Sequence, residues 1–460
     1  YNLPRWKKNK LKIYTINPAT EGRIVSYELF SQKKLNSVIK NSKEAFDKWK
    51  NYSVSYRASL IKKVGKGLLK NENKFAELIT TEMGKPIKES IAEIEKCAWL
   101  CDYYYENAER FLEEEKIKTE HKYSYIRFDP LGKILCIMPW NFPFWQVFRF
   151  AVPALCAGNS IILKHSSVTL GCSLEIEKLF NQCLNKNVFQ TVITNGNGVK
   201  HLMDHAEGVS LTGSVETGRF IAENAAKRLK KFVLELGGSD PFIVLKDADI
   251  KLTCQEAIKG RFINSGQSCI AAKRFIVVKE RFEEFSSKIT ELVKNLKVGN
   301  PMDMDTNVGP LAREDLLLKL DKQIKDSIKQ GAKVLYGATP AARKGYYYMP
   351  TVLFSKNNTR AVKEETFGPV FTIIKVENEK EAIKEANNSS YGLGASLWTK
   401  DIKKGMEYAK EIEAGVVSIN NIVKSDPRLP FGGIKNSGIG RELSRYGLLE
   451  FCNIKSVLID

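Results

Sequence analysis

Short, continuous apolar runs alternate with amphipathic segments over residues 134–236. The apolar runs predict strands, and they lie at residues 134–138, 160–163, 190–194, 209–212 and 231–236. The segments between them, at 144–157, 168–185, 198–206 and 215–229, carry apolar residues at helical spacing. Strands without polar alternation are buried on both faces, so this pattern predicts a parallel sheet covered by helices.

A second alternation of the same kind fills about residues 240–425. Strands are predicted at 242–245, 274–278, 333–336 and 371–376, and helices at 249–264, 280–296, 313–330 and 378–388. The expected fold class is therefore α/β, with two Rossmann-like parallel-sheet domains. In such sheets, ligands bind at the carboxyl ends of the strands.

The chain before the first sheet reads as mostly helical. Two short strands with a turn at Asn17-Pro18 are expected within residues 11–30. Helices are predicted at about 33–50, 55–71 and 74–83, and a long helix runs from Pro86 to about Glu115. Residues 123–128 alternate like an exposed strand without an obvious neighbour, which points to a role in oligomerisation.

Composition narrows the class of protein. A chain of 460 residues with 43% hydrophobic content can build more than one core. No apolar run approaches the roughly 20 residues that span a bilayer, and the first residues lack the apolar stretch of a secretion signal. Nine scattered cysteines do not form a disulfide framework and fit a reducing compartment, so we expect a cytoplasmic location.

The formal net charge of +19 raises the possibility of a basic nucleic-acid-binding or structural protein. Most of this charge is lysine mixed with glutamate along helical segments, without an arginine-rich stripe. A solvated surface explains it better, with some preference for anionic small substrates and no expected nucleic-acid partner. Cys97 with Cys101, and His201 with His205, lack further ligands at metal spacing, so no metal site is predicted.

Cys269 is the first candidate for chemistry. It lies in FINSGQSCIA (262–271), between a predicted helix and a predicted strand, and small or polar residues surround it. A nucleophile that a substrate must reach fits this setting. The alternative is a small buried hydrophobe, and the stretch by itself favours neither.

Three motifs fall at the ends of predicted strands. Asn141 in PWNFP (139–143) offers an amide donor, and Lys164 ends the strand SIIL, from which a lysine can reach ribose or phosphate. In TGSVETG (212–218), Gly213 allows close backbone approach, and Ser214 with the free N–H groups of a helix start can hold a phosphate. A tight turn is an equally good interpretation of this glycine pair.

Glu235 interrupts the apolar strand FVLEL and precedes two glycines. Burying a carboxylate there is costly unless it faces a polar cleft or serves as a base with a raised pKa. The structural alternative is a glutamate at a strand end paired with a lysine.

Taken together and in order, PWNFP, LTGSVETG, LELGG, GQSC, EETFGPV and PFGGIKNSGIGRE make the chain resemble the NAD(P)-dependent aldehyde dehydrogenase superfamily over essentially its whole length. LKHSSVTLGCS, AAKRF and GRELSRYGLLEFCNI are similar to the succinate-semialdehyde dehydrogenase group within it. The activity implied is oxidation of succinate semialdehyde to succinate. The enzyme alternative is a dehydrogenase for another anionic aldehyde or a broad range of aldehydes.

The resemblance implies a catalytic set. Cys269 would attack the aldehyde carbon to give a thiohemiacetal and then a thioester, and Glu235 would activate the water that hydrolyses it. Asn141 and the Cys269 backbone N–H would form the oxyanion hole.

The resemblance also implies where the cofactor and substrate bind. The cofactor contacts would be Trp140, Lys164, Ser167, Gly213, Ser214, Gly218, Glu365 and Phe367. Relatives that prefer NAD carry a glutamate at the position of Ser167, so NADP is favoured over NAD here. Arg149 and Ser425 would hold a substrate carboxylate. A further arginine of some relatives is replaced by Ile263, with Arg261 two residues away.

The family's organisation implies the domain boundaries. Residues 1–118 and 134–234 would form the cofactor-binding domain and 235–428 the catalytic domain. Residues 119–133 and 429–460 would form an oligomerisation flap and C-terminal segment, giving a homodimer or homotetramer.

Overall fold

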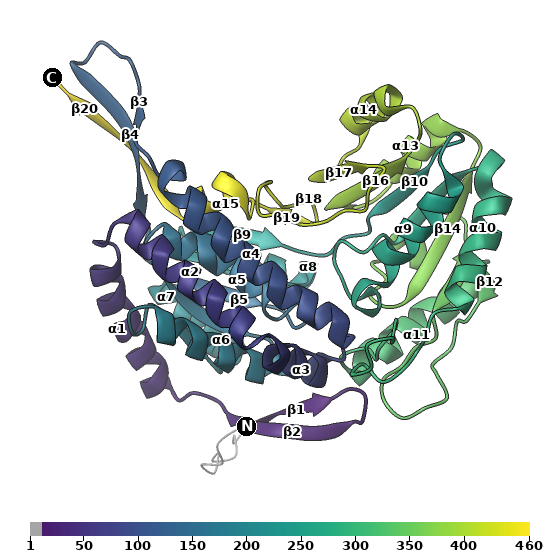
Figure 1. Ribbon diagram of the computed structural model, residues 1–460, viewed down its shortest axis with the longest axis horizontal. Coiled ribbons are helices and arrows are strands. Elements are labelled where there is room, and N and C mark those ends of the chain that lie inside the picture. The colour runs from purple at the N-terminus through teal and green to yellow at the C-terminus, as the bar shows by residue number, and fades with distance from the viewer. Residues whose placement is uncertain (1–11) are drawn as a thin grey trace, which may run out of the picture.

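Two β-sheets form the centres of the two lobes seen in Figure 1, a computed structural model that describes residues 12–460. The first sheet has six strands in the order β19-β9-β8-β5-β6-β7. Its strands are β5 (Lys133–Met138), β6 (Ser160–His165), β7 (Phe189–Val192), β8 (Gly208–Thr212), β9 (Lys231–Glu235) and β19 (Gly438–Ile439). The five predicted strands are confirmed, and neighbours among them pair in parallel.

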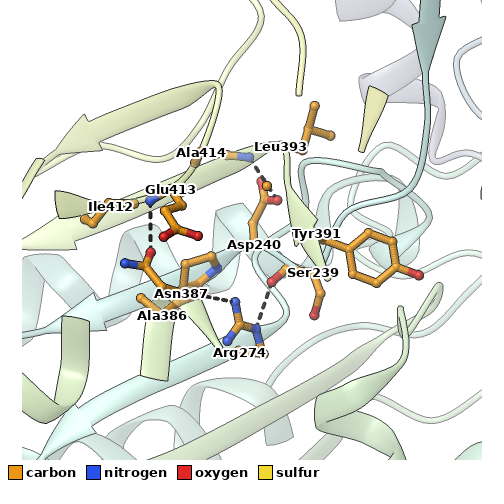
Figure 2. Close-up of a pocket in the computed structure, with 13 residues that line it drawn as sticks. Ser239, Asp240, Arg274, Ala386, Asn387, Tyr391, Leu393, Ile412, Glu413 and Ala414 are labelled. Carbon is orange, nitrogen blue, oxygen red and sulfur yellow. Dashed lines mark hydrogen bonds between the residues drawn. The ribbon is translucent and has the colours of Figure 1, made fainter. Parts of the chain in front are cut away.

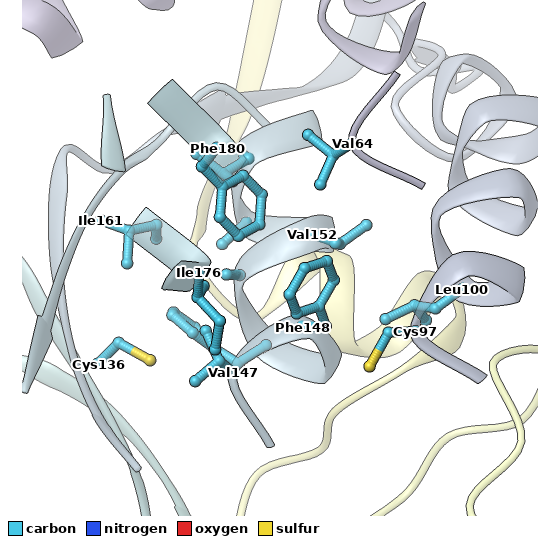
Figure 3. Packing of buried hydrophobic residues seen from close by; sticks show 14 of the residues in the cluster. Val64, Cys97, Leu100, Cys136, Val147, Phe148, Val152, Ile161, Ile176 and Phe180 are labelled. Atoms are coloured by element: carbon cyan, nitrogen blue, oxygen red, sulfur yellow. The ribbon is translucent and has the colours of Figure 1, made fainter. Parts of the chain in front are cut away.

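Helices follow the strands of this sheet at the predicted places. They are α5 (Trp145–Cys156), α6 (Leu170–Cys183), α7 (Gly196–His205) and α8 (Val215–Ala226). All residues of α5 are buried, because α2 (Val54–Lys70) and α4 (Ile87–Phe111) cover it as well as the sheet. Figure 3 shows Phe148 of α5 packed against Phe180 of α6, with ring centroids 5.1 Å apart.

The second sheet has seven strands in the order β12-β13-β14-β11-β10-β16-β17. These are β10 (Pro241–Val244), β11 (Arg274–Val278), β12 (Lys333–Tyr336), β13 (Thr351–Phe354), β14 (Val370–Val376), β16 (Gly394–Trp398) and β17 (Val416–Ile419). Its helices are α9 (Ile250–Phe262), α10 (Lys279–Lys294), α11 (Glu314–Lys329), α12 (Arg360–Lys363), α13 (Glu379–Asn387) and α14 (Ile402–Glu411).

The predicted α/β fold with two Rossmann-like sheets is confirmed, and each sheet also has one antiparallel edge strand. β12 pairs antiparallel with β13, and β19 pairs antiparallel with β9. The sequence prediction missed β13, β16 and α14. β13 and β16 are four and five residues long, too short to show a clear period, and α14 is a ten-residue helix that buries only Gly405.

The N-terminal part forms a hairpin and four helices, as predicted. The hairpin consists of β1 (Lys12–Asn17) and β2 (Gly22–Glu28), and the first three helices are α1 (Gln32–Trp49), α2 and α3 (Glu72–Met83). Ser31 and Ser53 cap α1 and α2 by accepting backbone hydrogen bonds. α4 ends at Phe111, one turn before the predicted end.

A three-stranded sheet extends away from both lobes and carries the C-terminus near its tip (Figure 1). It contains β3 (Glu115–Lys116), β4 (Tyr123–Pro130) and β20 (Cys452–Ile459), and β20 pairs antiparallel with β4 along its whole length. The strand at residues 123–128, for which the sequence showed no neighbour, therefore pairs with the last strand of the chain. Apolar side chains remain exposed here, including Ile454 at 58% and Leu458 at 57%.

The C-terminal region returns to the lobes before it reaches β20. The short pair β15 (Tyr391–Gly392) and β18 (Ile434–Lys435) is antiparallel, and α15 (Ser444–Leu449) leads into β20. Through this return, the glycine-rich segment at residues 430–442 lies against β9, where β19 pairs with Leu234 and Glu235.

Candidate active site

Cys269 lies between the 3₁₀ turn η2 (Ile263–Gly266) and β11, and its side chain is half-buried. We call residues 263–271 the nucleophile loop. Cys269 lines a cavity of about 220 Å³, to which this loop, α4, α5 and residues 422–425 contribute. The thiol is therefore not sealed in an apolar core, and a small molecule in this cavity can reach it.

The nucleophile loop has unusual backbone geometry. Asn264, Ser265 and Gly266 are all left-handed, with φ of 51°, 54° and 77°. Each non-glycine residue in this region costs about 1–2 kcal/mol. At Gly266 a side chain is also excluded, since a Cβ would lie 2.1 Å from the carbonyl oxygen of Gly368. Surrounding hydrogen bonds must hold such a turn in place.

Polar side chains from outside the loop supply those hydrogen bonds. Glu89 of α4 accepts from the Asn264 backbone N–H at 2.5 Å, and Asn264 Nδ2 donates to the Asn141 carbonyl oxygen at 2.7 Å. Buried Lys273 donates from Nζ to the carbonyl oxygens of Ser268, Cys269 and Ala271 at 2.8–3.0 Å. Sequence reasoning assigned no role to Glu89 or Lys273, because one charged residue in a helix or loop normally lies on the surface.

Asn141 follows β5 and lies directly beside the nucleophile loop. Its side chain is 4% exposed, and Nδ2 donates to the carbonyl oxygen of Gln267 at 3.2 Å. An amide has two N–H hydrogens, so a second donor remains. The strand end and the nucleophile are thus brought together from segments about a hundred residues apart.

The protein environment keeps the Cys269 thiol protonated. Burial raises the pKa of Cys269 to about 12, and the Glu235 carboxylate acts in the same direction. Arg149 and Lys273 oppose this rise. At neutral pH the resting enzyme therefore holds a thiol, and forming the thiolate requires a base or the arrival of ligands.

Glu235 ends β9 and is 2% exposed. Within residues 12–460, neither carboxylate oxygen has a hydrogen-bond partner. Burial raises the pKa of Glu235 well above its ordinary value, against the opposing effect of Arg149. The segment after it packs on the nucleophile loop, since a Cβ on Gly238 would lie 2.7 Å from the Cys269 carbonyl oxygen. A buried carboxyl without partners beside a thiol is typical of a base held for catalysis.

A network behind Gly238 fixes this segment (Figure 2). Arg274 Nε donates to the carbonyl oxygen of Ser239 at 2.9 Å, and Asp240 Oδ1 accepts from the Gly394 backbone N–H at 3.1 Å. The cavity among these residues measures only about 10 Å³, which leaves room for no more than one water. The hydrogen-bond network around this cavity is therefore structural, and it holds the turn after Glu235 in place.

The residues predicted at the first sheet's carboxyl edge gather around one surface. Lys164 is half-buried in β6 and, within the described chain, has no hydrogen-bond partner; burial lowers its pKa. Ser167 begins a 3₁₀ turn after β6 and is exposed. Ser214 caps α8 by accepting from the Thr217 backbone N–H, and Gly213 before it is open, since a Cβ there would meet only Leu211 at 3.6 Å.

Four further residues of the predicted cofactor set lie on both lobes near their junction. Trp140 contacts Phe367 edge to face, with ring centroids 5.7 Å apart. Glu365 Oε1 accepts from the Gly238 backbone N–H at 3.1 Å and lies 3.7 Å from Lys273 Nζ. Gly218 in α8 is required by packing, because a Cβ there would lie 2.6 Å from Leu236.

Arg149 projects from the fully buried helix α5 and lines the cavity. It is 2% exposed and forms an ion pair with Glu442, which is also buried. Its guanidinium lies 4.7 Å from the centre of the Phe431 ring and 3.4 Å from Thr212 Oγ1. Burial lowers the pKa of Arg149, but attraction to the Glu442 and Glu235 carboxylates raises it by more. The side chain therefore stays charged. The sequence did not reveal this partner in the glycine-rich segment.

Ser425 and Ile263 line the same cavity, whereas Arg261 turns away from it. Arg261 is fully buried and donates to the carbonyl oxygens of Ala272 and Thr366 at 3.0–3.1 Å. It therefore cannot replace the arginine that some relatives carry at the position of Ile263.

The described residues, 12–460, contain no cluster of histidine, cysteine and acidic side chains that could hold a metal ion. Over the same residues no helix is both long and apolar enough to cross a membrane.

The fold and the open cavity are those of an α/β oxidoreductase, and the chain belongs to the aldehyde dehydrogenase family, whose model matches residues 6–457. It is 44% identical over 453 residues to a probable NADP(+) succinate-semialdehyde dehydrogenase of Synechocystis sp., covering 98% of this chain and 100% of the relative. It is 40% identical to the NAD(P)+ succinate semialdehyde dehydrogenase Sad of Escherichia coli, covering 97% of each.

Among solved structures, the chain is similar to succinic semialdehyde dehydrogenase from Streptococcus pyogenes in complex with NADP+. The TM-score is 0.95 at 34% identity, over 97% of this chain and 99% of that one. The family assignment leaves the alternative of a basic nucleic-acid-binding or structural protein without support.

Proposed function

We propose that this enzyme oxidises succinate semialdehyde to succinate and prefers NADP+ to NAD+. The observation that carries the proposal is the cavity in which the Cys269 thiol and the cationic side chains Arg149 and Lys96 share one lining. An aldehyde can reach the thiol while a carboxylate elsewhere in the same molecule meets positive charge. The succinate-semialdehyde dehydrogenases among the relatives, at 38–44% identity, support the same substrate.

The chemistry follows from three side chains. Cys269 passes its thiol proton to solvent water in the cavity and its sulfur bonds to the aldehyde carbon, while the Asn141 amide and the Cys269 backbone N–H stabilise the oxyanion. Bound NADP+ would supply the hydride acceptor that oxidation of this adduct to a thioester requires. Glu235 then takes a proton from water, whose oxygen attacks the thioester carbon and releases the carboxylate and the thiol. The buried, unpartnered carboxyl of Glu235 suits this role because its raised pKa makes it a stronger base.

The residues at the lobe junction fit a dinucleotide. Lys164 is a half-buried ammonium without a partner in the described chain, and the open backbone at Gly213 leads into the first turn of α8, so both suit an anion. Glu365 and Phe367 from the other lobe would hold a ribose and the nicotinamide end. Trp140, Ser214 and Gly218 would complete the pyrophosphate region.

We expect kcat/KM to be higher with NADP+ than with NAD+, because the exposed Ser167 does not repel a 2′-phosphate. Replacing Ser167 with glutamate adds a negative charge there, and like charges at close range cost several kcal/mol. The Ser167→Glu enzyme should therefore shift the NADP+ to NAD+ ratio of kcat/KM toward NAD+ by about tenfold or more. Ser167→Gln is the size-matched uncharged control. A hundredfold preference of the wild type for NAD+ would contradict the assignment.

A panel of aldehydes tests the substrate. We expect the highest kcat/KM for succinate semialdehyde, followed by other aldehydes that carry a terminal carboxylate, and low values for neutral aldehydes of the same length. The rate is measured from the absorbance of the reduced cofactor. If butanal were oxidised as efficiently as succinate semialdehyde, the broad-range alternative would replace this proposal.

We further propose the organisation implied by the sequence. Residues 1–118 and 134–234 act as the cofactor-binding domain, and 235–428 as the catalytic domain. The projecting sheet of β3, β4 and β20 is the oligomerisation flap; its exposed Ile454 and Leu458 support burial against another subunit in a homodimer or homotetramer. All nine cysteines are free in the described chain, which suits the reducing cytoplasm that we propose as its location.

A further inference from the structure

Five charged side chains line the active-site cavity besides the half-buried thiol. Lys424 is exposed to solvent, and the four that are enclosed are Glu89, Glu93, Lys96 and Arg149. Glu93 is fully engaged: it pairs with Lys85 and accepts from the backbone N–H groups of Phe144 and Trp145 at 2.8 and 2.9 Å. Glu89 accepts from the nucleophile loop at 2.5 Å. The two acidic residues therefore hold structure, and Arg149 and Lys96 are the two enclosed cations that a substrate carboxylate could meet, since Lys424 is exposed to solvent.

Arg149 is already paired. Its ion pair with Glu442 joins two side chains that are 2% and 3% exposed. The Glu442 carboxylate already balances part of the positive charge that a substrate carboxylate would meet at Arg149. Replacing Arg149 would also leave Glu442 buried without its partner, which is strongly destabilising. The arginine is thus a weak source of charge selectivity, and its substitution is a poor test.

Lys96 differs in each of these respects. It projects from α4 into the cavity, and within residues 12–460 its ammonium forms no ion pair. Nζ donates to Ser425 Oγ at 2.9 Å and lies 4.2 Å from the centre of the Trp145 ring. Both contacts fix the ammonium in position while two of its three N–H hydrogens stay free.

Ser425 is oriented by the same cluster. Its Oγ accepts from Lys96 Nζ and also from Trp145 Nε1 at 3.1 Å. A hydroxyl has two lone pairs, so both are used and its own hydrogen must point elsewhere. Lys96 and Ser425 together therefore present N–H and O–H donors at the cavity wall, which is the arrangement that a carboxylate requires.

We propose that the Lys96 ammonium, held by Ser425 over the Trp145 ring, pairs with the substrate carboxylate and gives the enzyme its preference for aldehydes that carry one. This inference rests on the proposed function and names the residue that carries its charge selectivity. Glu89 lies seven residues earlier on α4, about 10 Å away along the helix axis, and its carboxylate accepts from the Asn264 backbone N–H.

The test compares succinate semialdehyde with butanal, a neutral aldehyde of the same chain length. In the Lys96→Met enzyme we expect kcat/KM for succinate semialdehyde to fall about ten- to a hundredfold, the loss of one charge-assisted hydrogen bond, mainly through a higher KM. The value for butanal should change less than about twofold, because the nucleophile and cofactor sites are untouched. Lys96→Arg should recover much of the lost KM effect.

A matched control is available on a neighbouring helix. Lys62 of α2 is also half-buried and lies 4.0 Å from the centre of the Tyr105 ring, but it does not line the cavity. Lys62→Met should leave both substrates unchanged. Equal melting temperatures of the two methionine variants, with equal NADP+ binding, would exclude misfolding as the cause of the effect at Lys96.

pH supplies a second readout. Burial lowers the pKa of Lys96 to about 8, and repulsion from Arg149 adds to this shift. The titratable and charged groups near it are Glu93 and the neutral Cys97 thiol on α4, Arg149 on α5, and Asp426, which is paired with Arg428. Lys96 is charged below its pKa, so KM for succinate semialdehyde should rise as the pH passes about 8, relative to butanal. Lys96→Arg should remove that rise.

The outcomes separate the two proposals. If the wild type oxidised butanal but not succinate semialdehyde, the proposed function would be refuted. If the wild type preferred succinate semialdehyde and Lys96→Met kept that preference, or lost activity equally on both aldehydes, the assignment of Lys96 would be overturned while the function stood.

Discussion

The Cys269→Ala enzyme is expected to lose at least about four orders of magnitude in kcat, as enzymes do when their nucleophile is removed. Every covalent step requires the sulfur, and no other thiol lines the cavity. The rate is followed by NADPH absorbance with succinate semialdehyde in excess. NADP+ should still bind, because the residues proposed to hold it lie on other segments.

Cys183 provides the matched control for this experiment. It is half-buried like Cys269, but it belongs to α6 and does not line the cavity. Cys183→Ala should therefore keep wild-type activity. If Cys269→Ala also kept more than a few per cent of the wild-type rate, the sulfur would not be the nucleophile and the proposed chemistry would be wrong.

The Glu235→Gln enzyme is expected to stop after the first half of the reaction. Glutamine cannot accept a proton from water, so steady-state kcat should fall about 10²- to 10⁴-fold. Thioester formation needs no base at this position, and a burst of NADPH close to one per subunit should precede the slow phase. Stopped-flow absorbance measures the burst and the slow phase together.

The pH profile of the wild type should reflect the same carboxyl. Burial raises the pKa of Glu235, so the carboxyl is protonated, and inactive as a base, over a wider range of low pH than an ordinary glutamate. When hydrolysis limits the rate, kcat should rise as the pH passes this raised pKa. Glu235→Gln should lack the rise.

Glu207 serves as the control for this substitution. It precedes β8, the strand next to β9, and so lies at the amino end of the strands, whereas Glu235 lies at the carboxyl end. It pairs with Lys133 at 2.8 Å. Glu207→Gln should show neither the burst nor the change in pH profile. A Glu235→Gln enzyme with wild-type kcat would exclude Glu235 as the base.

Much of the fold could be predicted because its central strands are continuous apolar runs. β5, β6 and β8 are almost wholly buried, and such strands leave an unambiguous pattern. The weaker elements were missed for the opposite reason. β16 is short and begins at a glycine, and α14 contacts the core along one narrow edge, so tertiary packing rather than local pattern determines them.

The candidate site was predicted where its residues break a local pattern. Glu235 inside an apolar strand and Cys269 among small polar residues are unusual for their surroundings, and both lie at the junction of the lobes. Lys96 and Lys273 could not be found in this way. Each is one lysine among many in the sequence, and only the packing of α4 and β11 against other segments shows that they are enclosed.

The central claim is that the aldehyde carbon becomes bonded to the sulfur of Cys269, and the trapped intermediate tests it most directly. Glu235→Gln enzyme mixed with NADP+ and succinate semialdehyde, quenched in acid and digested, should yield the peptide containing Cys269 with one succinyl group attached. The Cys269→Ala, Glu235→Gln double variant should yield no succinylated peptide. Succinylation of another residue, or a full burst of NADPH without any acylated peptide, would contradict the account.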